Sequence, residues 1–214
     1  MSKNIEKLVE TIVKLSVTEF NAIESALAKL KLSMAKVELS TLVPGETFKI
    51  GEHDFIVLKQ DLTLLQTFVI SKDLMAEYKA FDSNTKNYNK SSLKKFIEKD
   101  IQPIIEAEVG VENLVEHDVD LTSVDMQNEF CTCKCKVRPI TFDEAREFNS
   151  LLVNKDLPDW WWTCTPWSTE ERGYSRSLSV VSPSGNFNYN YCNCNYGVRP
   201  VCILKSNIFV SKGE

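Results

Sequence analysis

Residues 160–204 read WWWTCTPWSTEERGYSRSLSVVSPSGNFNYNYCNCNYGVRPVCIL, and this stretch decides the predicted fold. Polar and apolar residues alternate through Ser175–Ser182, turn residues follow at Pro183–Gly185, and the alternation resumes through Asn186–Tyr191. A period of two on both sides of a Gly-containing turn is typical of a β-hairpin. The sequence therefore predicts two antiparallel strands joined by this turn.

The second strand of the hairpin is rich in asparagine. From Asn186 to Asn190 a period of two places the asparagines on one face and the aromatic residues on the other, while Asn193 and Asn195 follow with opposite parity. Asparagine is disfavoured in strands, so five of them within ten residues indicate a role beyond fold stability. Amides donate and accept hydrogen bonds and tyrosines supply contact area, which favours a recognition surface. A polar sheet surface that binds nothing is the alternative.

Residues 40–160 mix short strands with short helices. Three segments are rich in β-branched and aromatic residues, as strands are: Thr47–Ile50, His53–Leu58 and Thr67–Ser71. Ser91 or Ser92 can cap one helix, and Thr141–Glu144 has the spacing of a capping box that begins another. The sequence therefore predicts the α+β class.

The first 40 residues are predicted to be helical, because apolar residues recur at three- and four-residue steps in two series. The series are Ile5, Leu8, Ile12, Leu15 and Phe20, Ile23, Leu27, Leu30, Met34, Val37. Ser16–Glu19 has capping-box spacing between them, so a helical hairpin and a coiled coil with a discontinuity both fit. We expect a helical oligomerisation segment at residues 1–40 and a binding domain at residues 41–214. Packing of the helices on that domain is the alternative to homo-oligomerisation.

Bulk properties exclude several classes of partner. The formal charge is −5 at pH 7, so no basic surplus is available for a phosphate backbone, and we expect no nucleic-acid partner. No apolar run approaches the roughly 18 residues needed to cross a bilayer, and the N-terminus lacks the pattern of a signal peptide. We expect no membrane association, and a location in the cytoplasm or in an assembled phage virion.

Motifs of catalysis are absent from the sequence: it contains no GxGxxG, P-loop or HExxH pattern. The only histidines, His53 and His117, are expected to be solvated. Cysteines cluster at Cys131–Cys135 and Cys192–Cys194 with one-residue gaps. Two clusters that meet could bind zinc, but strand cysteines at this spacing share one face, which is the simpler interpretation. We expect a protein that is not an enzyme and has neither a metal nor a cofactor.

Three motifs together resemble a bacterial and phage domain family of unknown function. They are WWWTCTPW at 160–167, SPSGNFNYNY at 182–191 and YGVRPVCIL at 196–204. That family looks like a branch of the C-type-lectin-like fold, which also includes the variable proteins of diversity-generating retroelements and the formylglycine-generating enzymes. The resemblance implies a C-type-lectin-like domain that binds a protein or glycan ligand without catalysis.

In the variable proteins, adenine-directed mutagenesis scatters Asn, Tyr and Ser residues over a C-terminal binding face, and NFNYNYCNCNY at 186–196 is similar to such a product. The ligand-facing residues that this resemblance implies are Tyr174, Arg176, Asn186, Asn188, Asn190, Asn193, Asn195 and Tyr196. The framework residues that it implies are Trp160, Trp161, Trp167, Gly197, Val198, Arg199 and Pro200.

Two other functions remain open. A phage-encoded inhibitor of a host protein would use the same face. An oxidase of the formylglycine-generating type would use Cys192 and Cys194, although their one-residue gap departs from the wider spacing of that family. For Arg199 we expect a structural role in either case, since a guanidinium in a closing strand can satisfy several carbonyl groups.

Overall fold

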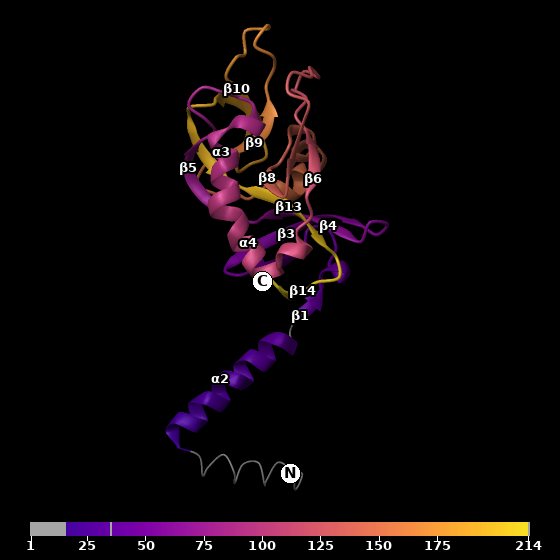
Figure 1. Ribbon diagram of the computed structural model, residues 1–214, viewed down its shortest axis with the longest axis vertical. Helices are drawn as coiled ribbons and strands as arrows, with labels where there is room; N and C mark the ends of the chain where they lie inside the picture. Colours follow the sequence, from indigo (N-terminus) through magenta and orange to yellow (C-terminus); the bar gives the residue numbers. More distant parts are fainter. Residues whose placement is uncertain (1–15, 35, 214) are drawn as a thin grey trace. The chain divides into compact units, whose positions relative to one another are not determined.

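The computed structural model describes residues 16–34 and 36–213 (Figure 1). The chain divides into two units, the first ending at Val37 and the second beginning at Glu38. Helix α2 (Val17–Met34) belongs to the first unit. The backbone N–H of Ser16 donates to Glu19 at 2.9 Å and that of Glu19 to the Ser16 hydroxyl at 3.4 Å, so the predicted capping box starts this helix. The helix predicted before Ser16 lies outside the described residues.

A mostly antiparallel, seven-stranded sheet contains the largest part of the β-structure. Its order is β1 (Lys36–Glu38), β14 (Phe209–Lys212), β2 (Thr47–Ile50), β3 (His53–Asp61), β4 (Gln66–Ser71), β13 (Pro200–Lys205) and β8 (Val137–Pro139). From β14 to β8 each strand runs antiparallel to its neighbour. The strands predicted around residues 47–71 are thus confirmed as a meander.

A second sheet of five strands carries the C-terminal hairpin. Its order is β11 (Phe187–Tyr191), β10 (Ser177–Val181), β9 (Trp161–Pro166), β12 (Asn195–Val198) and β5 (Ala76–Ala80). Strands β9 and β12 are parallel, and the other pairs are antiparallel. Strands β6 (His117–Asp120) and β7 (Thr132–Cys135) form a separate two-stranded sheet.

Short helices complete the α+β fold that the sequence predicts. They are α3 (Ser92–Phe96), the π-turn η3 (Ile97–Ile101), α4 (Gln102–Val109), α5 (Phe142–Glu147) and α6 (Asn149–Leu152), with 3-10 turns η1 (Leu39–Thr41), η2 (Tyr88–Lys90) and η4 (Val111–Asn113). Ser91 caps α3 and Thr141 forms the predicted capping box of α5. None of the helices between residues 16 and 213 is long and apolar enough to span a membrane.

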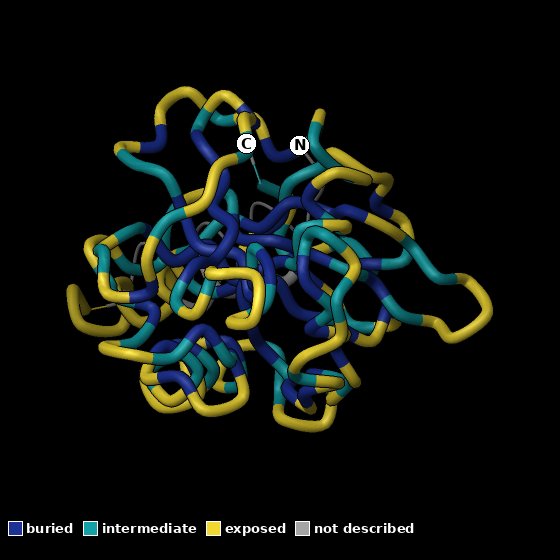
Figure 2. The backbone as a smooth tube through the Cα atoms, turned by 90° about the horizontal axis from the view of Figure 1, so that it is seen from above, coloured by how far each residue is buried: buried dark blue, intermediate teal, exposed yellow. Residues whose placement is uncertain are grey.

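The main core lies where α5 and α6 pack between the two sheets. Ile56 of β3 and Val201 of β13 come from the larger sheet, Trp161 of β9 and Val181 of β10 from the smaller, and Ala145 of α5 joins them. Figure 2 shows buried segments in the interior and exposed segments toward the outside. The hairpin β10–β11 is therefore attached to a packed scaffold.

Two long loops, β6–β7 and β9–β10, leave the same end of the second unit (Figure 1). Asp125 in the first loop accepts hydrogen bonds from Ser168 and Arg172 in the second, both at 2.6 Å. Desolvation raises the pKa of Asp125, but hydrogen bonds from Ser123, Ser168 and Arg172 outweigh it and hold the pKa at about 2. The buried ammonium of Lys86 donates to the Ser168 carbonyl at 2.6 Å. These contacts fix the two loops to each other.

Candidate recognition surface on the C-terminal hairpin

The turn of the hairpin is held in place from both sides. Gly185 has φ +82°, a conformation that side chains disfavour, and its N–H donates to the Ser182 carbonyl at 2.9 Å. The Ser182 hydroxyl accepts from the N–H of Asn186 at 2.9 Å. Asn149 of α6 donates its amide to the Gly185 carbonyl at 2.9 Å, which fixes the turn to a helix of the core. The predicted hairpin is therefore confirmed and rigidly supported.

Strand β11 lies at the edge of its sheet, because it pairs with β10 alone. The N–H of Cys192 donates to the Arg176 carbonyl at 2.7 Å and that of Ser182 to the Asn186 carbonyl at 2.9 Å. In an antiparallel pair every second residue directs its N–H and C=O groups toward the neighbouring strand, so the even-numbered residues between Asn186 and Cys192 face β10. The N–H groups of Tyr189 and Tyr191 therefore point away from the sheet.

The aromatic residues of β11 share one face, as the period of two predicts. Tyr189 stacks on Trp167 with ring centroids 4.8 Å apart, and Tyr174 meets it edge-on at 5.7 Å. The guanidinium of Arg176 lies 5.8 Å from the centre of the Tyr191 ring. Tyr189 and Tyr191 remain 41% and 56% exposed. We call Trp167, Tyr174, Arg176, Tyr189 and Tyr191 the aromatic face.

The asparagines of β11 accept hydrogen bonds from backbone N–H groups at the free edge of the strand. The side-chain carbonyl of Asn188 accepts from the N–H of Tyr189 at 2.9 Å, and that of Asn190 accepts from the N–H of Tyr191 at 2.8 Å. These are the two donors that point away from the sheet. Asn188 and Asn190 thus have a structural role, since they cap edge donors that could otherwise pair with another strand. The sequence suggested a recognition surface or an inert polar surface, and neither of these included such capping.

Asn190 and Tyr196 meet on the opposite face from the tyrosines. The Asn190 amide donates to the Tyr196 hydroxyl, and the Tyr196 ring meets Trp162 edge-on with centroids 4.9 Å apart. The thiol of Cys194 donates to the Asn190 side-chain carbonyl at 3.3 Å. The nitrogen and the oxygen of the Asn190 side-chain amide therefore both have partners within the protein, and Asn190 and Tyr196 are only half-exposed.

The eight residues expected to face a ligand do not form one surface. Tyr174 and Arg176 belong to the aromatic face, whereas Asn190 and Tyr196 contact each other on the other side of β11. Exposed positions among the eight are Asn186 in the β10–β11 turn, Asn188 on the strand, Asn193 in the turn after β11, and Asn195 at the start of β12. Tyr189 and Tyr191 are exposed but are not among the eight expected residues. The alternating pattern of the sequence had already placed both on one face of the strand.

Among the expected framework residues, Arg199 is buried and packs on Trp161, whereas Trp167 belongs to the aromatic face. Arg199 donates from Nε to the Ser71 carbonyl at 2.8 Å and from Nη1 to the Leu152 carbonyl at 2.6 Å, while its guanidinium lies 4.9 Å from the centre of the Trp161 ring. Desolvation lowers the pKa of Arg199 to about 10. A Cβ at Gly197 would lie 2.5 Å from Cδ1 of Leu74, so a larger residue at this nearby position requires the Leu74 side chain to move.

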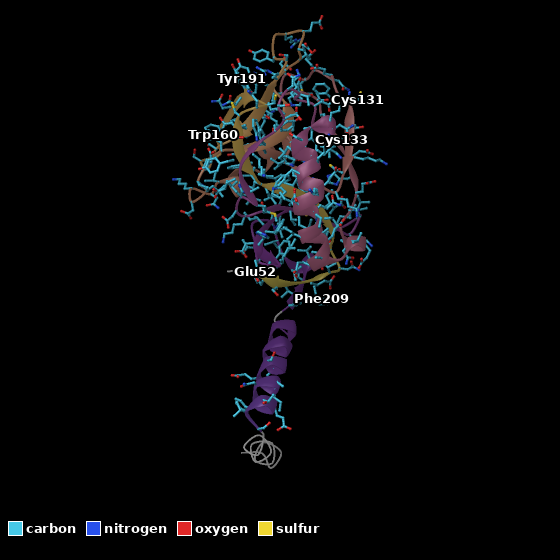
Figure 3. The ribbon with its side chains drawn as sticks, turned by 60° about the vertical axis from the view of Figure 1, so that its left-hand side comes forward. Glu52, Cys131, Cys133, Trp160, Tyr191 and Phe209 are labelled. Carbon is cyan, nitrogen blue, oxygen red and sulfur yellow. The ribbon has the colours of Figure 1, made fainter. Side chains whose placement is uncertain are left out.

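The cysteines are free thiols. Cys133 and Cys135 of β7 are both buried on one face, as the spacing predicts for a strand. Figure 3 shows Cys131 and Cys133 on the opposite side of the unit from Tyr191, the neighbour of Cys192. Among the described residues, no group of three or more His, Cys, Asp or Glu side chains could hold a metal ion. Desolvation raises the pKa of Cys192, which disfavours its reactive thiolate form.

A polar constellation outside the hairpin was not expected from the sequence. Arg138 of β8 forms a bidentate pair with Glu144 of α5, at 2.6 and 2.7 Å, and its Nε donates to Nε2 of His117 at 3.1 Å. Desolvation and the Arg138 charge lower the pKa of His117. The expectation of a solvated His117 is therefore wrong, because β6 brings it against a buried arginine. The tripeptide Val-Arg-Pro occurs at 137–139 and again at 198–200, which is the only sequence signal for Arg138.

No protein-family model matches the chain, and comparisons with curated proteins and with solved structures give no match. The α+β class is established by the elements above, and the function is inferred from the residues and geometry of this chain.

Proposed function

We propose that this protein is a non-catalytic recognition protein that binds a protein or glycan ligand through the aromatic face and the exposed asparagines of the C-terminal hairpin. The observation that carries the proposal is the half-exposed pair Tyr189 and Tyr191 on a fixed edge strand. Trp167, Tyr174 and Arg176 hold both rings, so little side-chain entropy is lost on binding. Rigid amphipathic rings beside adaptable amides suit recognition of either ligand class.

The C-type-lectin-like fold belongs to the same proposal. Its support is an α+β unit in which a second sheet and two joined loops are built on a larger antiparallel sheet. We infer a bacterial or phage protein whose exposed Asn186, Asn193 and Asn195 are positions of sequence diversity. Their exposed side chains can change without loss of core packing. Self-association through residues 1–40 would multiply weak sites on one particle.

The test compares two exposed aromatic residues at separate places on the second unit. Tyr191→Ser removes a ring of the aromatic face, and Phe209→Ser removes an equally exposed ring from β14, well away from Tyr191 in Figure 3. Both variants and the wild type are applied to an array of bacterial surface glycans and to immobilised proteins of a bacterial extract. We expect the wild type and the Phe209 variant to bind one spot or protein, and the Tyr191 variant to lose about tenfold or more in affinity.

Circular dichroism and thermal melts establish that both variants are folded. If Tyr191→Ser and Phe209→Ser weaken binding equally, or if only Phe209→Ser does, the aromatic face is not the binding site. Binding that survives Tyr191→Ser but is lost in an Asn193→Ala, Asn195→Ala double variant would move the site to the turn after β11.

A further inference from the structure

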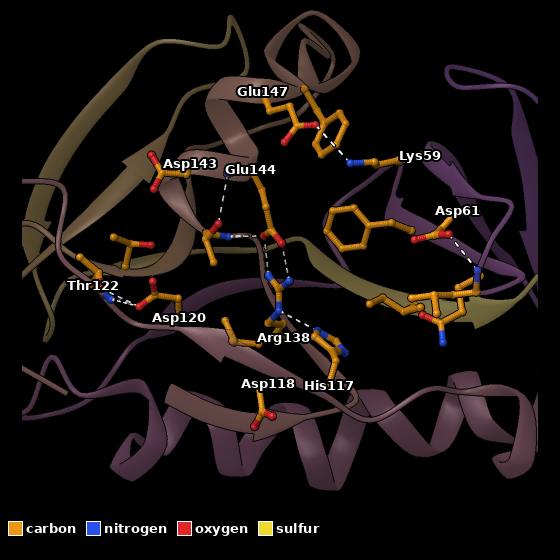
Figure 4. Close-up of a pocket in the computed structure, with 18 residues that line it drawn as sticks. Lys59, Asp61, His117, Asp118, Asp120, Thr122, Arg138, Asp143, Glu144 and Glu147 are labelled. Atoms are coloured by element: carbon orange, nitrogen blue, oxygen red, sulfur yellow. Dashed lines mark hydrogen bonds and ion pairs between the residues drawn. The ribbon is translucent and has the colours of Figure 1, made fainter. Parts of the chain in front are cut away.

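A pocket of about 440 Å³ lies between the larger sheet, helix α5 and the β6–β7 hairpin (Figure 4). Its walls come from Lys59 and Asp61 of β3, Phe68 of β4, residues 117–120 of β6, and residues 141–148 around α5. This volume is within the range of about 300–1,000 Å³ that is usual for small-molecule sites. None of the residues that line the pocket belongs to the aromatic face, so a ligand of the pocket would bind independently of that face.

One wall of the pocket is apolar. Phe68 and Phe148 meet with ring centroids 5.9 Å apart, and Ile203 and Leu64 extend this wall. Arg138 lies on the Phe68 ring, 5.6 Å from its centre, and its pairing with Glu144 keeps it in place. The two rings are tilted by 57° to each other, and an apolar wall of this kind can bury methylene groups.

Carboxylates predominate among the charged side chains of the pocket and come from several of its sides (Figure 4). Six carboxylates line the pocket (Asp61, Asp118, Asp120, Asp143, Glu144 and Glu147) against two permanent cations, Lys59 and Arg138, for a formal charge of −4. His117 does not offset this charge, because desolvation and Arg138 lower its pKa and favour the neutral ring. Arg138 is neutralised by Glu144, and the ion pair described for Lys59 is a long one with Glu147, at 3.8 Å.

Two of these carboxylates are held rigidly while leaving one oxygen available. Oδ1 of Asp120 accepts from the N–H and hydroxyl of Thr122, and Oδ1 of Asp61 accepts from the N–H groups of Thr63 and Leu64. The described hydrogen bonds of both aspartates thus end on Oδ1. Their second oxygens are preorganised acceptors at fixed positions.

We propose that this pocket binds an aliphatic amine in its cationic form, with the ammonium group on the carboxylates and the methylene chain on Phe68 and Phe148. A net negative lining repels anions, and a neutral apolar ligand would desolvate carboxylates without pairing them. The same chemistry is offered by a free diamine and by a lysine side chain of a protein.

Isothermal titration of the full-length chain with three five-carbon probes tests the ligand class. The probes are cadaverine, pentane-1,5-diol and glutarate, which share a chain length and differ in charge. We expect cadaverine to bind, with an affinity that falls as salt is added, and the other two to show no heat of binding at the same concentrations. Failure of cadaverine to bind at millimolar concentration, or equal binding of the diol or glutarate, overturns the proposal.

Charge-removing variants test the place of binding. Glu147→Gln removes a rim carboxylate, and Asp120→Asn keeps the oxygen that accepts from Thr122 while it removes the charge. We expect each to weaken cadaverine binding about two- to fivefold. Glu52→Gln, at an exposed turn outside the pocket, is the matched control and should leave affinity unchanged. Equal weakening by all three variants would show diffuse surface attraction and refute the pocket.

Two probes with a single positive charge distinguish the two sources of the amine. Nα-acetyl-lysine N-methylamide carries a butyl-ammonium chain on a peptide backbone, and pentylamine is a free amine of the same charge. Tighter binding of the lysine derivative than of pentylamine assigns the pocket to a lysine of a protein partner, and the reverse order assigns it to a free amine. Binding of neither probe refutes the shared chemistry, whereas the aromatic face would be unaffected by that result.

Discussion

At the scale of single residues, the buried charges of two arginines are compensated in different ways. Arg138 and Arg199 are the central residues of the two Val-Arg-Pro tripeptides. Val137–Pro139 is strand β8, whereas Val198 ends β12 and Pro200 begins β13, opposite Pro139. Arg138 is neutralised by Glu144, whereas the hydrogen bonds described for Arg199 end on backbone carbonyls of Ser71 and Leu152. Arg199 therefore ties the end of β4 to the end of α6, and its removal leaves two acceptors buried.

We predict that Arg199→Ala destabilises the second unit by about 3 kcal/mol, because two buried carbonyls lose their donors and a cavity opens beside Trp161. For a unit of this size, that corresponds to a fall in melting temperature of about 6–12 °C. Arg199→Lys keeps a charge and one donor and should melt between the two. A melting temperature unchanged in Arg199→Ala would contradict the structural role.

The sequence predicted the structural role of Arg199 but not the contact between His117 and Arg138. Arg199 belongs to the recognisable motif YGVRPVCIL, so a role for its donors could be expected from the sequence, although it lies between β12 and β13 and not within a strand. The partner of His117 is Arg138, 21 residues along the chain and in another sheet. Such a contact depends on how strands are arranged in space, and a single sequence has no local pattern that reports it.

At the scale of elements, the edge of β11 explains why asparagine is frequent in a strand. Asn188 and Asn190 cap the two N–H groups that β10 cannot reach. We predict that Asn188→Ala speeds hydrogen exchange of the Tyr189 amide about two- to tenfold, since one exposed hydrogen bond is lost. The measurement is amide exchange followed by NMR.

The Tyr191 amide, which Asn190 caps, is the internal reference for this experiment and should keep its rate. Asn188→Asp retains an acceptor oxygen and should preserve the protection of Tyr189. Faster exchange at both amides in Asn188→Ala would indicate general fraying of β11, and no change at Tyr189 would disprove the capping.

Sequence patterns within a few residues predicted the helix caps and the hairpin turn, whereas features that depend on contacts between distant segments were not predicted. The turn at Gly185 and the caps at Ser16, Ser91 and Thr141 depend on neighbours within four residues, and all were found in place. The alternation in β10 instead predicted one solvent-exposed face, yet the strand is buried on both faces. The Ser179 hydroxyl is accommodated there because it donates to the Thr165 carbonyl at 3.1 Å. Likewise, no pattern in the sequence indicated that β9 and β12 run parallel or that a pocket would form beside β6.

At the scale of the whole molecule, helix α2 has an apolar stripe that requires a partner. Phe20, Ile23 and Leu27 lie within one side of the helix and are 45%, 38% and 49% exposed, and an isolated helix of this length is marginal in water. A second copy of the chain offers the same stripe, so self-association covers both at once.

We therefore predict that the full-length chain is oligomeric at micromolar concentration, as measured by light scattering after size-exclusion chromatography. Replacing Phe20 and Leu27 with glutamate places charges on the stripe and should yield monomers. Ala22→Glu adds a charge to the other side of the same helix and should leave the oligomer intact. A monomeric wild type would refute self-association. Dissociation by Ala22→Glu as well would show that helix stability, and not the apolar stripe, controls assembly, because only the stripe distinguishes the two substitutions.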